Sequence, residues 1–238
     1  MQSKQALFFN FDIQAQPDEV TCGPTCLHSL YQYYDDNISL KKVIQEVKQL
    51  SSGGTLAVML GDHALKRGYN AHIYTYNLTV FDPSWFTGNT RQMIDLLKKQ
   101  RRYKKKKRKL QAASEAYINF LEAGGKVMQA ELNEDLILKY LKRSIPVLTG
   151  LSATYLYGTP REIPDTNKYD SIKGEPAGHF VVINGYDSKD KSVYLADPLN
   201  PNPQKSQYYK VKINRLINSI LLGIVTYDAN LLIIEPRK

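Results

Sequence analysis

The sequence predicts an α+β fold, in which helices from the first third of the chain pack on an antiparallel sheet from the last third. Apolar residues recur at helical spacing up to about residue 67, whereas short runs with strand-like composition follow residue 145. The chain has 238 residues, of which 42% are hydrophobic, so it can bury one large core. We therefore expect a single domain over residues 1–238, with a helical insertion at about 82–130.

Three helices are expected before residue 70, each preceded by a residue whose side chain can accept a hydrogen bond from the first turn. The expected caps are Thr21, Ser39 and Thr55. The first helix begins at Cys22 and carries Pro24 in its first turn, where a missing N–H is tolerated. The third helix ends near Arg67, because Gly68 is typical of a helix C-terminus.

Runs rich in β-branched and aromatic residues indicate strands after the third helix and again toward the end of the chain. The expected strands are residues 69–76, 146–157, 179–186, 192–198, 208–213 and 230–236. Residues 179–186 and 192–198 are expected to pair as a hairpin. Residues 89–123 and 133–144 are expected to be helical. We expect Gly124 and Gly125 to form the loop that ends the helical stretch 89–123. We do not expect this double glycine to be a cleavage site within the chain.

The net charge of +9 is concentrated in one segment. Residues 101–109 read RRYKKKKRK, a run with eight basic side chains and no acidic one, so the rest of the chain is nearly neutral. Such a run is usually a solvated face, and it can also attract an acidic peptide or a membrane surface. Only Tyr103 interrupts the run, so aromatic platforms for stacking bases are absent and nucleic acid is not an expected partner.

Composition also limits the setting of the protein. Two cysteines are too few for a disulfide framework, and no apolar run approaches the roughly 20 residues that span a bilayer. The N-terminal residues show no signal-peptide pattern, so we expect a cytoplasmic location. Cys22 and Cys26 are spaced like a metal pair, but a structural zinc site needs four protein ligands and no second pair exists. We expect no metal and no cofactor, and we expect Cys26 to be a buried core residue.

Cys22 is the candidate nucleophile. The unpaired N–H groups and the dipole of a helix start favour a thiolate there, and Gly23 leaves the approach of an acyl group open. The same features also fit a helix cap without chemistry. Gln16 can donate its amide N–H toward the point that the Cys22 backbone N–H also faces, and two such donors hold an oxyanion during acyl transfer. An exposed glutamine without a role is the alternative.

His179 is the candidate base, because it begins the predicted hairpin and a carboxylate lies on the other arm. Pairing Tyr186 with Val193 places His179 opposite Asn200, and a tighter turn brings Asp197 to the same edge. Either residue can hold the second ring nitrogen of the imidazole, as the third member of a catalytic triad does. The histidines that are not candidates are His28, His63 and His72.

The ordered set Q-x5-C-G-P, G-H-F-V-V-I and A-D-P resembles the papain-like cysteine peptidases of the bacteriocin-processing type, which cleave leader peptides after a double glycine. The resemblance covers about residues 10–80 and 140–238. It implies a papain-like fold, with Cys22 as nucleophile, His179 as base, Asp197 as the residue that orients the imidazole and Gln16 as the oxyanion donor. Many members are amino-terminal domains of membrane transporters, whereas here we expect a stand-alone, soluble member.

The expected function is thiol-dependent hydrolysis of a peptide or amide bond. Two alternatives remain open: acyl or peptidyl transfer with the same triad, and a non-catalytic peptide- or polyanion-binding module on the same fold. The expected partner is a peptide or protein substrate, and the basic run is compatible with an acidic one. The sequence leaves the oligomeric state open.

Overall fold

The computed structural model describes residues 6–51, 53–164, 166 and 168–237. The expected absence of a signal peptide rests in part on residues 1–5, which lie outside the described residues. The helices are α1 (Cys22–Tyr33), α2 (Leu40–Glu46), α3 (Ala57–Lys66), α4 (Thr90–Tyr103), α5 (Arg108–Glu122), α6 (Glu134–Leu141), α7 (Ala153–Tyr157) and α8 (Ile213–Leu222), with the short 3-10 helices η1 (Pro83–Thr87) and η2 (Gly223–Thr226). The main strands are β2 (Tyr69–Thr75), β4 (Val147–Ser152), β7 (Gly178–Asp187), β8 (Ser192–Ala196), β9 (Tyr208–Lys212) and β10 (Asn230–Pro236). Shorter strands are β1 (Ala6–Phe8), β3 (Lys126–Met128), β5 (Glu162–Ile163) and β6 (Lys168–Tyr169).

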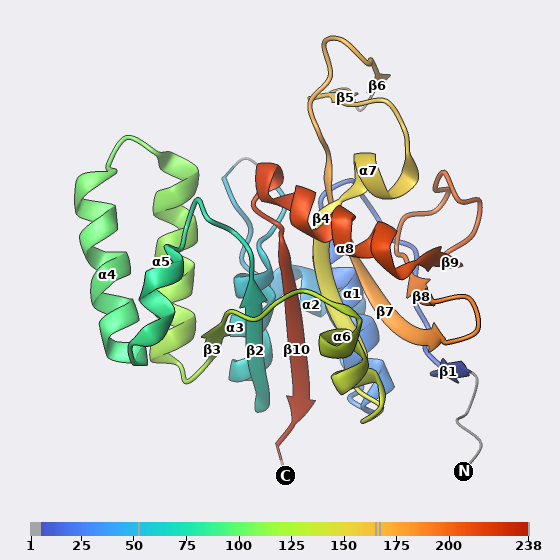
Figure 1. Ribbon diagram of the computed structural model, residues 1–238, viewed down its shortest axis with the longest axis horizontal. Coiled ribbons are helices and arrows are strands. Elements are labelled where there is room, and N and C mark those ends of the chain that lie inside the picture. The colour runs from blue at the N-terminus through green and yellow to red at the C-terminus, as the bar shows by residue number, and fades with distance from the viewer. Residues whose placement is uncertain (1–5, 52, 165, 167, 238) are drawn as a thin grey trace.

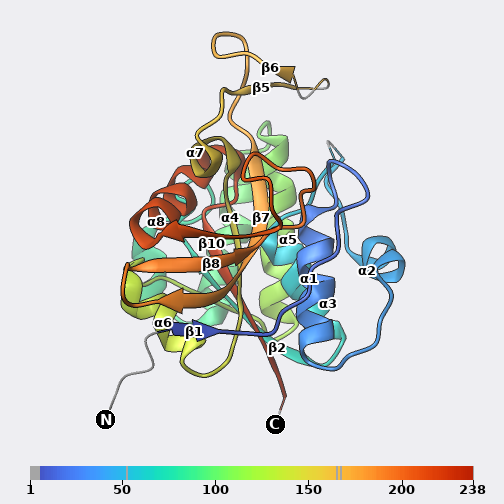
Figure 2. The same ribbon diagram turned by 90° about the vertical axis from the view of Figure 1, so that its right-hand side faces the viewer.

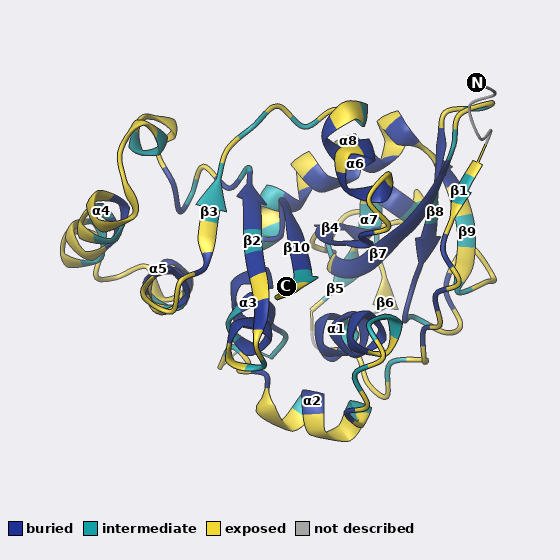
Figure 3. Ribbon diagram, turned by 90° about the horizontal axis from the view of Figure 1, so that it is seen from below, coloured by how far each residue is buried: buried dark blue, intermediate teal, exposed yellow. Residues whose placement is uncertain are grey.

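One twisted sheet organises the molecule (Figure 1). Its strand order is β3-β2-β10-β4-β7-β8-β9, and β1 pairs with the far end of β7. All neighbours are antiparallel except β2 and β3. Helices α1 and α3 lie on one face of the sheet, and α6 and α8 lie on the other (Figure 3). The predicted α+β class, with helices on a mostly antiparallel sheet, is confirmed.

The core is a single apolar cluster between the sheet and its helices. Strand β10 crosses the middle of the sheet, and its residues from Leu231 to Ile234 are fully buried. Helix α1 contributes Leu27, Leu30 and Tyr31, which are also fully buried. Burial at this level fixes α1 against the sheet, because each such side chain contributes on the order of 1.5–3 kcal/mol.

The helix caps only partly follow the prediction. Ser39 does cap α2, since its side chain accepts a hydrogen bond from the Lys42 N–H. Thr21 precedes α1 as expected, but its hydroxyl donates to the Asp18 carbonyl and makes no capping bond. The expected cap at Thr55 is wrong, because α3 begins one residue later than that cap requires and the Thr55 hydroxyl donates to the Lys48 carbonyl.

Residues 146–157 were expected to form one strand, and this prediction is wrong in its second half. Strand β4 stops at Ser152, whose side chain accepts a hydrogen bond from the Tyr155 N–H and so starts helix α7. Gly158, with φ of +71°, ends that helix. This short helix brings Tyr157 to the end of the sheet where His179 lies.

The hairpin of β7 and β8 has the predicted pairing of Tyr186 with Val193. A bulge between Ile183 and Gly185 then shifts the register by one residue, so Val182 pairs with Ala196. An inserted residue of this kind redirects the strand beyond it. As a result, the position opposite His179 moves from Asn200 toward Asp197.

Helices α4 and α5 form an antiparallel hairpin beside the edge of the sheet that carries β3 (Figures 1 and 3). Its inner face buries Leu97, Leu110 and Phe120, and Phe120 fits over Gly61 of α3, where a side chain would collide with the ring. The structure thus has two helices where one was expected over residues 89–123, and the break between them falls at residues 104–107, within the basic run. No helix in the described residues is both long and apolar enough to cross a membrane.

Candidate active site

Cys22 is the first residue of α1 and is partly exposed. Because the Thr21 hydroxyl points away to Asp18, no side chain caps the first N–H groups of this helix. Helix starts with free N–H groups stabilise negative charge, so the position favours a thiolate or an oxyanion.

Two neighbours of Cys22 hold α1 against β7. Cys26, one turn along, is fully buried, and its thiol donates to the Phe180 carbonyl at 3.3 Å. Burial raises the pKa of Cys26 well above its ordinary value, so this thiol stays neutral. Gly23 was expected to keep the approach of an acyl group open, but it faces the interior instead. A Cβ atom there would lie 2.6 Å from Thr55 Cγ2, so Gly23 permits close packing.

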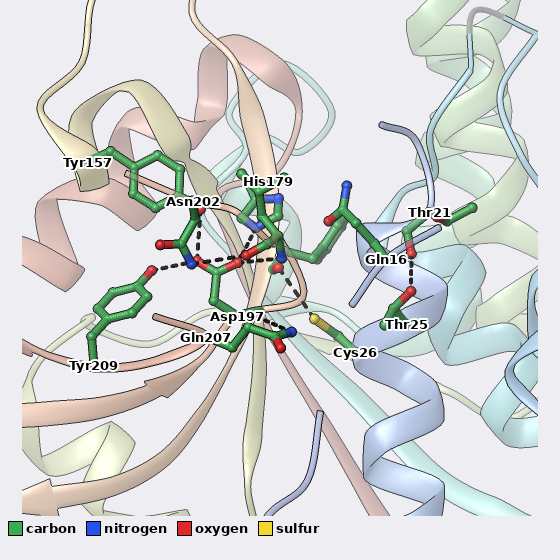
Figure 4. Close-up of polar contacts among 12 residues, drawn as sticks. Gln16, Thr21, Thr25, Cys26, Tyr157, His179, Asp197, Asn202, Gln207 and Tyr209 are labelled. Carbon is green, nitrogen blue, oxygen red and sulfur yellow. Dashed lines mark hydrogen bonds and ion pairs between the residues drawn. The ribbon is translucent and has the colours of Figure 1, made fainter. Parts of the chain in front are cut away.

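His179 and Asp197 form a buried pair at the end of the sheet (Figure 4). The imidazole Nε2 lies 2.8 Å from Asp197 Oδ1. Both side chains are almost completely buried, with exposed fractions of 6% and 0%. Cys22 is also close enough to His179 to contribute, after burial and Asp197, to the shifted pKa of the imidazole. The structure thus brings together Cys22, His179 and Asp197, whereas the competing Asn200 is exposed.

Asp197 accepts further hydrogen bonds that the sequence did not indicate. The hydroxyls of Tyr157 and Tyr209 donate to Oδ2 at 2.8 Å and 2.6 Å, and the Leu199 N–H donates to Oδ1 at 3.0 Å. These donors leave the carboxylate little freedom to rotate. Asp197 is therefore fixed in the orientation that meets the imidazole.

The charges of the pair stabilise each other. Burial alone would lower the pKa of His179, but the charge and hydrogen bond of Asp197, together with Cys22, raise it to about 10. Burial alone would raise the pKa of Asp197, but His179, the Tyr209 hydroxyl and the Leu199 N–H keep it below its ordinary value. The favoured state near neutral pH is an imidazolium facing a carboxylate.

Gln16 lies in the loop that leads to α1. Its backbone N–H donates to the Pro198 carbonyl at 2.8 Å, which ties this loop to the residue after Asp197. Its side-chain nitrogen donates to the Asp18 carbonyl at 2.8 Å, and its side-chain oxygen is buried without a hydrogen-bond partner among the described residues. An amide nitrogen carries two hydrogens, so one remains available for a further acceptor.

A cleft of about 320 Å³ runs past Cys22 and His179. Its walls come from the loop before α1, the loop after α2, strand β7, the segment after η2 and the start of α5. The lining residues are Glu19, Val20, Cys22, Leu50, Gly53, Gly54, Thr55, Leu56, Lys109, Gly178, His179, Phe180, Thr226 and Asp228. Gln16 is not among them.

Three charged residues of this cleft, Glu19, Lys109 and Asp228, were not predicted from the sequence to belong to the site. Asp228 is buried beside Gly178, where any side chain would collide with its carboxyl group. Burial raises the pKa of Asp228 to about 7, although the Thr226 hydroxyl and Lys109 oppose the shift. Lys109 reaches the cleft from the basic run. No sequence motif surrounds Asp228, and Lys109 could be noted only as part of the basic run, so only the fold reveals that both line the cleft.

The remaining histidines lie elsewhere. His28 is buried in the core, where burial lowers its pKa. His63 lies 2.8 Å from the Tyr31 hydroxyl and 3.1 Å from Glu46, and His72 lies 3.5 Å from Glu235. Within the described residues, no group of three or more His, Cys, Asp or Glu side chains is arranged to hold a metal ion.

Comparison with solved structures finds the same fold in a putative C39-like peptidase from Bacillus anthracis, with a TM-score of 0.53 and 16% identity over 99% of this chain and 100% of that one. A double glycine motif protease from an AMS/PCAT transporter in complex with the leader peptide gives a TM-score of 0.46 and 15% identity, over 97% of this chain and 94% of that chain. Xylellain, a cysteine protease from Xylella fastidiosa, gives a TM-score of 0.45 and 16% identity, over 98% of this chain and 87% of that chain.

No curated protein matches the chain. The model of the Peptidase_C39 like family, however, matches residues 8–219, which is most of its length. The matched range contains the start of α1 and both arms of the hairpin with His179. The chain therefore belongs to the Peptidase_C39 like family and is a cysteine peptidase.

Proposed function

We propose that this peptidase cleaves a peptide or amide bond with Cys22 as nucleophile, His179 as base and Asp197 as the residue that orients the imidazole. The observation that carries this proposal is the position of His179, between the thiol of Cys22 and the buried, fourfold hydrogen-bonded carboxylate of Asp197. Since Nε2 faces Asp197, Nδ1 is the ring nitrogen left for Cys22.

The steps follow from this arrangement. The Cys22 thiolate attacks the scissile carbonyl carbon, and the carbonyl oxygen becomes an oxyanion. The Cys22 backbone N–H and the free amide hydrogen of Gln16 stabilise that oxyanion. The imidazolium of His179 then donates its proton to the leaving amine, and the acyl group stays on sulfur. A water molecule that gives its proton to His179 attacks the thioester and releases the acid.

The test is the alkylation rate of Cys22 by iodoacetamide as a function of pH, followed by peptide mapping. In the wild type, Cys22 should react near pH 6 well before the buried Cys26, because an adjacent imidazolium stabilises the thiolate. His179→Ala should slow this reaction at pH 6 by at least about tenfold and move its pH profile upward. Asp197→Asn should reduce peptide cleavage strongly and alkylation less, because the ring loses its orientation while the thiol remains.

Asn200→Ala is the matched control, since Asn200 is exposed and is the competing partner on the same arm of the hairpin. Its alkylation profile and its cleavage of a peptide library should equal those of the wild type. Circular dichroism confirms that each variant is folded. An unchanged Cys22 profile in folded His179→Ala would show that the two residues do not act as a pair.

A further inference from the structure

The turn between α4 and α5 carries a group of basic side chains that form no ion pair in the described part of the chain. The charge of Lys104 does contribute, after the Ser84 hydrogen bonds, to the lowered pKa of Asp82. Residues 104–108, here called the basic tip, comprise four lysines and Arg108, and all five are exposed. Among them, only Lys104 has a side-chain hydrogen bond, to Gln100. Arg101, by contrast, is paired with Glu115 at 3.0 Å. The basic tip is therefore free to bind an external anion.

Lys109 attaches the basic tip to the active-site cleft. Its Nζ donates to the Thr226 carbonyl at 3.1 Å and lies 4.8 Å from the centre of the Tyr227 ring. The same residue lines the cleft together with Cys22 and His179. Lys109 follows the tip directly in α5, so the tip adjoins the cleft through this residue, although none of residues 104–108 lines the cleft itself.

Acidic residues occupy other parts of the cleft. Glu19 lines it, and Glu19 raises the pKa of Glu162 after the larger effect of burial, so these two carboxylates are neighbours. Glu162 belongs to β5, which stands with the α4–α5 turn at the upper end of the molecule but on the opposite side (Figure 1). Asp228 lies near Lys109, but it is buried and hydrogen-bonded to Thr226. Lys109 thus lies on the α5 side of the cleft, and Glu19 lies on the β5 side with Glu162 beside it. The segment with β5 and β6, which projects from the molecule (Figure 2), also carries the exposed Arg161 and Lys168, so its charge is mixed.

We propose that the basic tip binds an acidic segment of the peptide substrate and so places the scissile bond over Cys22. This proposal rests on the proposed function of the cleft. An extended peptide advances about 3.3 Å per residue. A substrate that is held at Cys22 and runs along the cleft past Lys109 would carry its next residues toward the tip. The carboxylates of Glu19 and Glu162 would repel the same segment on the other side, which fixes the direction of the chain.

A peptide fits the tip better than other polyanions do. Base stacking requires aromatic side chains with a free face near the cations. Within the basic run only Tyr103 is aromatic, and Trp85, which lines a pocket with Tyr103 and Lys104, is partly buried. A membrane surface would meet a narrow turn in which Tyr103 is the single exposed apolar side chain over residues 101–109. The cleft adjoining the tip, in contrast, already contains the elements that bind and cleave a peptide.

The experiment uses two octapeptides, one of glutamate and one of glutamine, each in a fluorescent form and in a form that carries a chloroacetyl group at one end. The tip variant replaces Lys104, Lys105, Lys106 and Lys107 with glutamine. The control variant removes the same charge at exposed lysines outside the cleft: Lys41, Lys126, Lys142 and Lys189. Fluorescence anisotropy measures binding, and mass spectrometry measures the rate at which the Cys22 thiolate displaces chloride and forms a thioether.

At low salt, the wild type and the control variant should bind the glutamate peptide about tenfold more tightly than the glutamine peptide, with the preference falling as salt rises. The glutamate reagent should likewise alkylate Cys22 faster, because the tip raises its local concentration. The tip variant should lose both preferences. Equal binding of the two peptides to the wild type, or an unchanged preference in the tip variant, would overturn the proposal.

Binding does not involve the chemistry of Cys22, so it decides the role of the tip even if the thiol proves unreactive. Loss of alkylation by both peptides in the wild type would count against the proposed function only. A single-stranded oligonucleotide and a phosphatidylserine vesicle serve as competing polyanions. If either one binds through the tip while the wild type does not distinguish the two peptides, the tip has another partner and the proposal fails.

Discussion

Gln16 is the residue of the site whose chemical role can best be separated from its role in the fold. Its backbone, rather than its side chain, ties the loop to Pro198. Gln16→Ala should therefore keep the loop in place and lower kcat by about 10²–10³-fold with little change in KM, because an oxyanion donor acts in the transition state. Steady-state kinetics on the best peptide from a library screen would measure both constants.

Two variants control this experiment. Gln16→Glu keeps the size of the side chain but has no amide hydrogen, so it should be as impaired as Gln16→Ala. Gln14→Ala removes an exposed glutamine from the same loop and should behave like the wild type. A change confined to KM in Gln16→Ala would make Gln16 a substrate contact instead.

Some residues of the candidate site could be predicted from the sequence, and others could not. Cys22, His179 and Asp197 could be selected because each lies in a short motif and because the hairpin predicts the last two to be neighbours. Tyr157 and Tyr209 could not be selected, since an aromatic residue in an apolar run is typical of core packing. Their hydroxyls meet at Asp197 only through the arrangement of α7 and β9 around the end of β8.

At the scale of elements, the position of α1 depends on Gly23. A methyl group there would lie 2.6 Å from Thr55 Cγ2 and 3.3 Å from Phe180 Cδ2. Gly23→Ala should therefore destabilise the protein by about 1–3 kcal/mol, the usual range for overpacking a core. It should also slow the alkylation of Cys22, because α1 must shift relative to His179. Urea denaturation and alkylation measure the two effects.

Thr55→Ser provides the matched partner for this change. Serine lacks the methyl group that the new side chain would meet and keeps the hydroxyl that donates to the Lys48 carbonyl. The double variant should recover part of the stability lost in Gly23→Ala. If the two changes are additive, the collision with Thr55 is not the reason for the glycine.

The elements themselves were predictable to different degrees. Helix α1, strand β2 and the start of α2 follow from apolar spacing, and they were predicted to within one or two residues. The end of α2 was not, since the helix stops at Glu46, well before the break expected at residues 51–54. Helix α7 was missed because the β-branched and apolar residues before it favour a strand, and only the cap at Ser152 ends that strand. Helix α8 was missed, although Ile213, Leu216 and Ile220 are buried on its inner side at helical spacing.

At the scale of the whole molecule, the buried pair of His179 and Asp197 is also a structural junction. Asp197 joins β8 to β7 through His179, to α7 through Tyr157 and to β9 through Tyr209. These elements lie far apart in the sequence and meet at one buried carboxylate. The global stability of the protein should therefore depend on the protonation of this pair.

The direction of that dependence follows from the two pKa shifts. The raised pKa of His179 adds stability that is fully present below its ordinary value of 6.5 and is lost as the pH rises through about 10. The lowered pKa of Asp197 adds stability that is present above its ordinary value of 3.8 and is lost as the pH falls through its lower folded value. Both contributions are complete only between about pH 4 and 6.5.

Asp197→Asn should therefore cost the most stability within that window. The expected loss is about 3–5 kcal/mol, because the buried imidazolium of His179 is left without its opposite charge. The loss should shrink steadily as the pH rises toward 10, where the imidazolium of the wild type also loses its proton. Urea denaturation at pH 5, 7 and 9.5 gives the three differences in the free energy of unfolding. Asp190→Asn, at a partly exposed ion pair with Lys210, should cost much less stability than Asp197→Asn at each pH, because solvent screens such a pair. A loss for Asp197→Asn that stays constant from pH 5 to 9.5 would mean that the carboxylate stabilises the fold through its tyrosine hydrogen bonds and not through a charged His179.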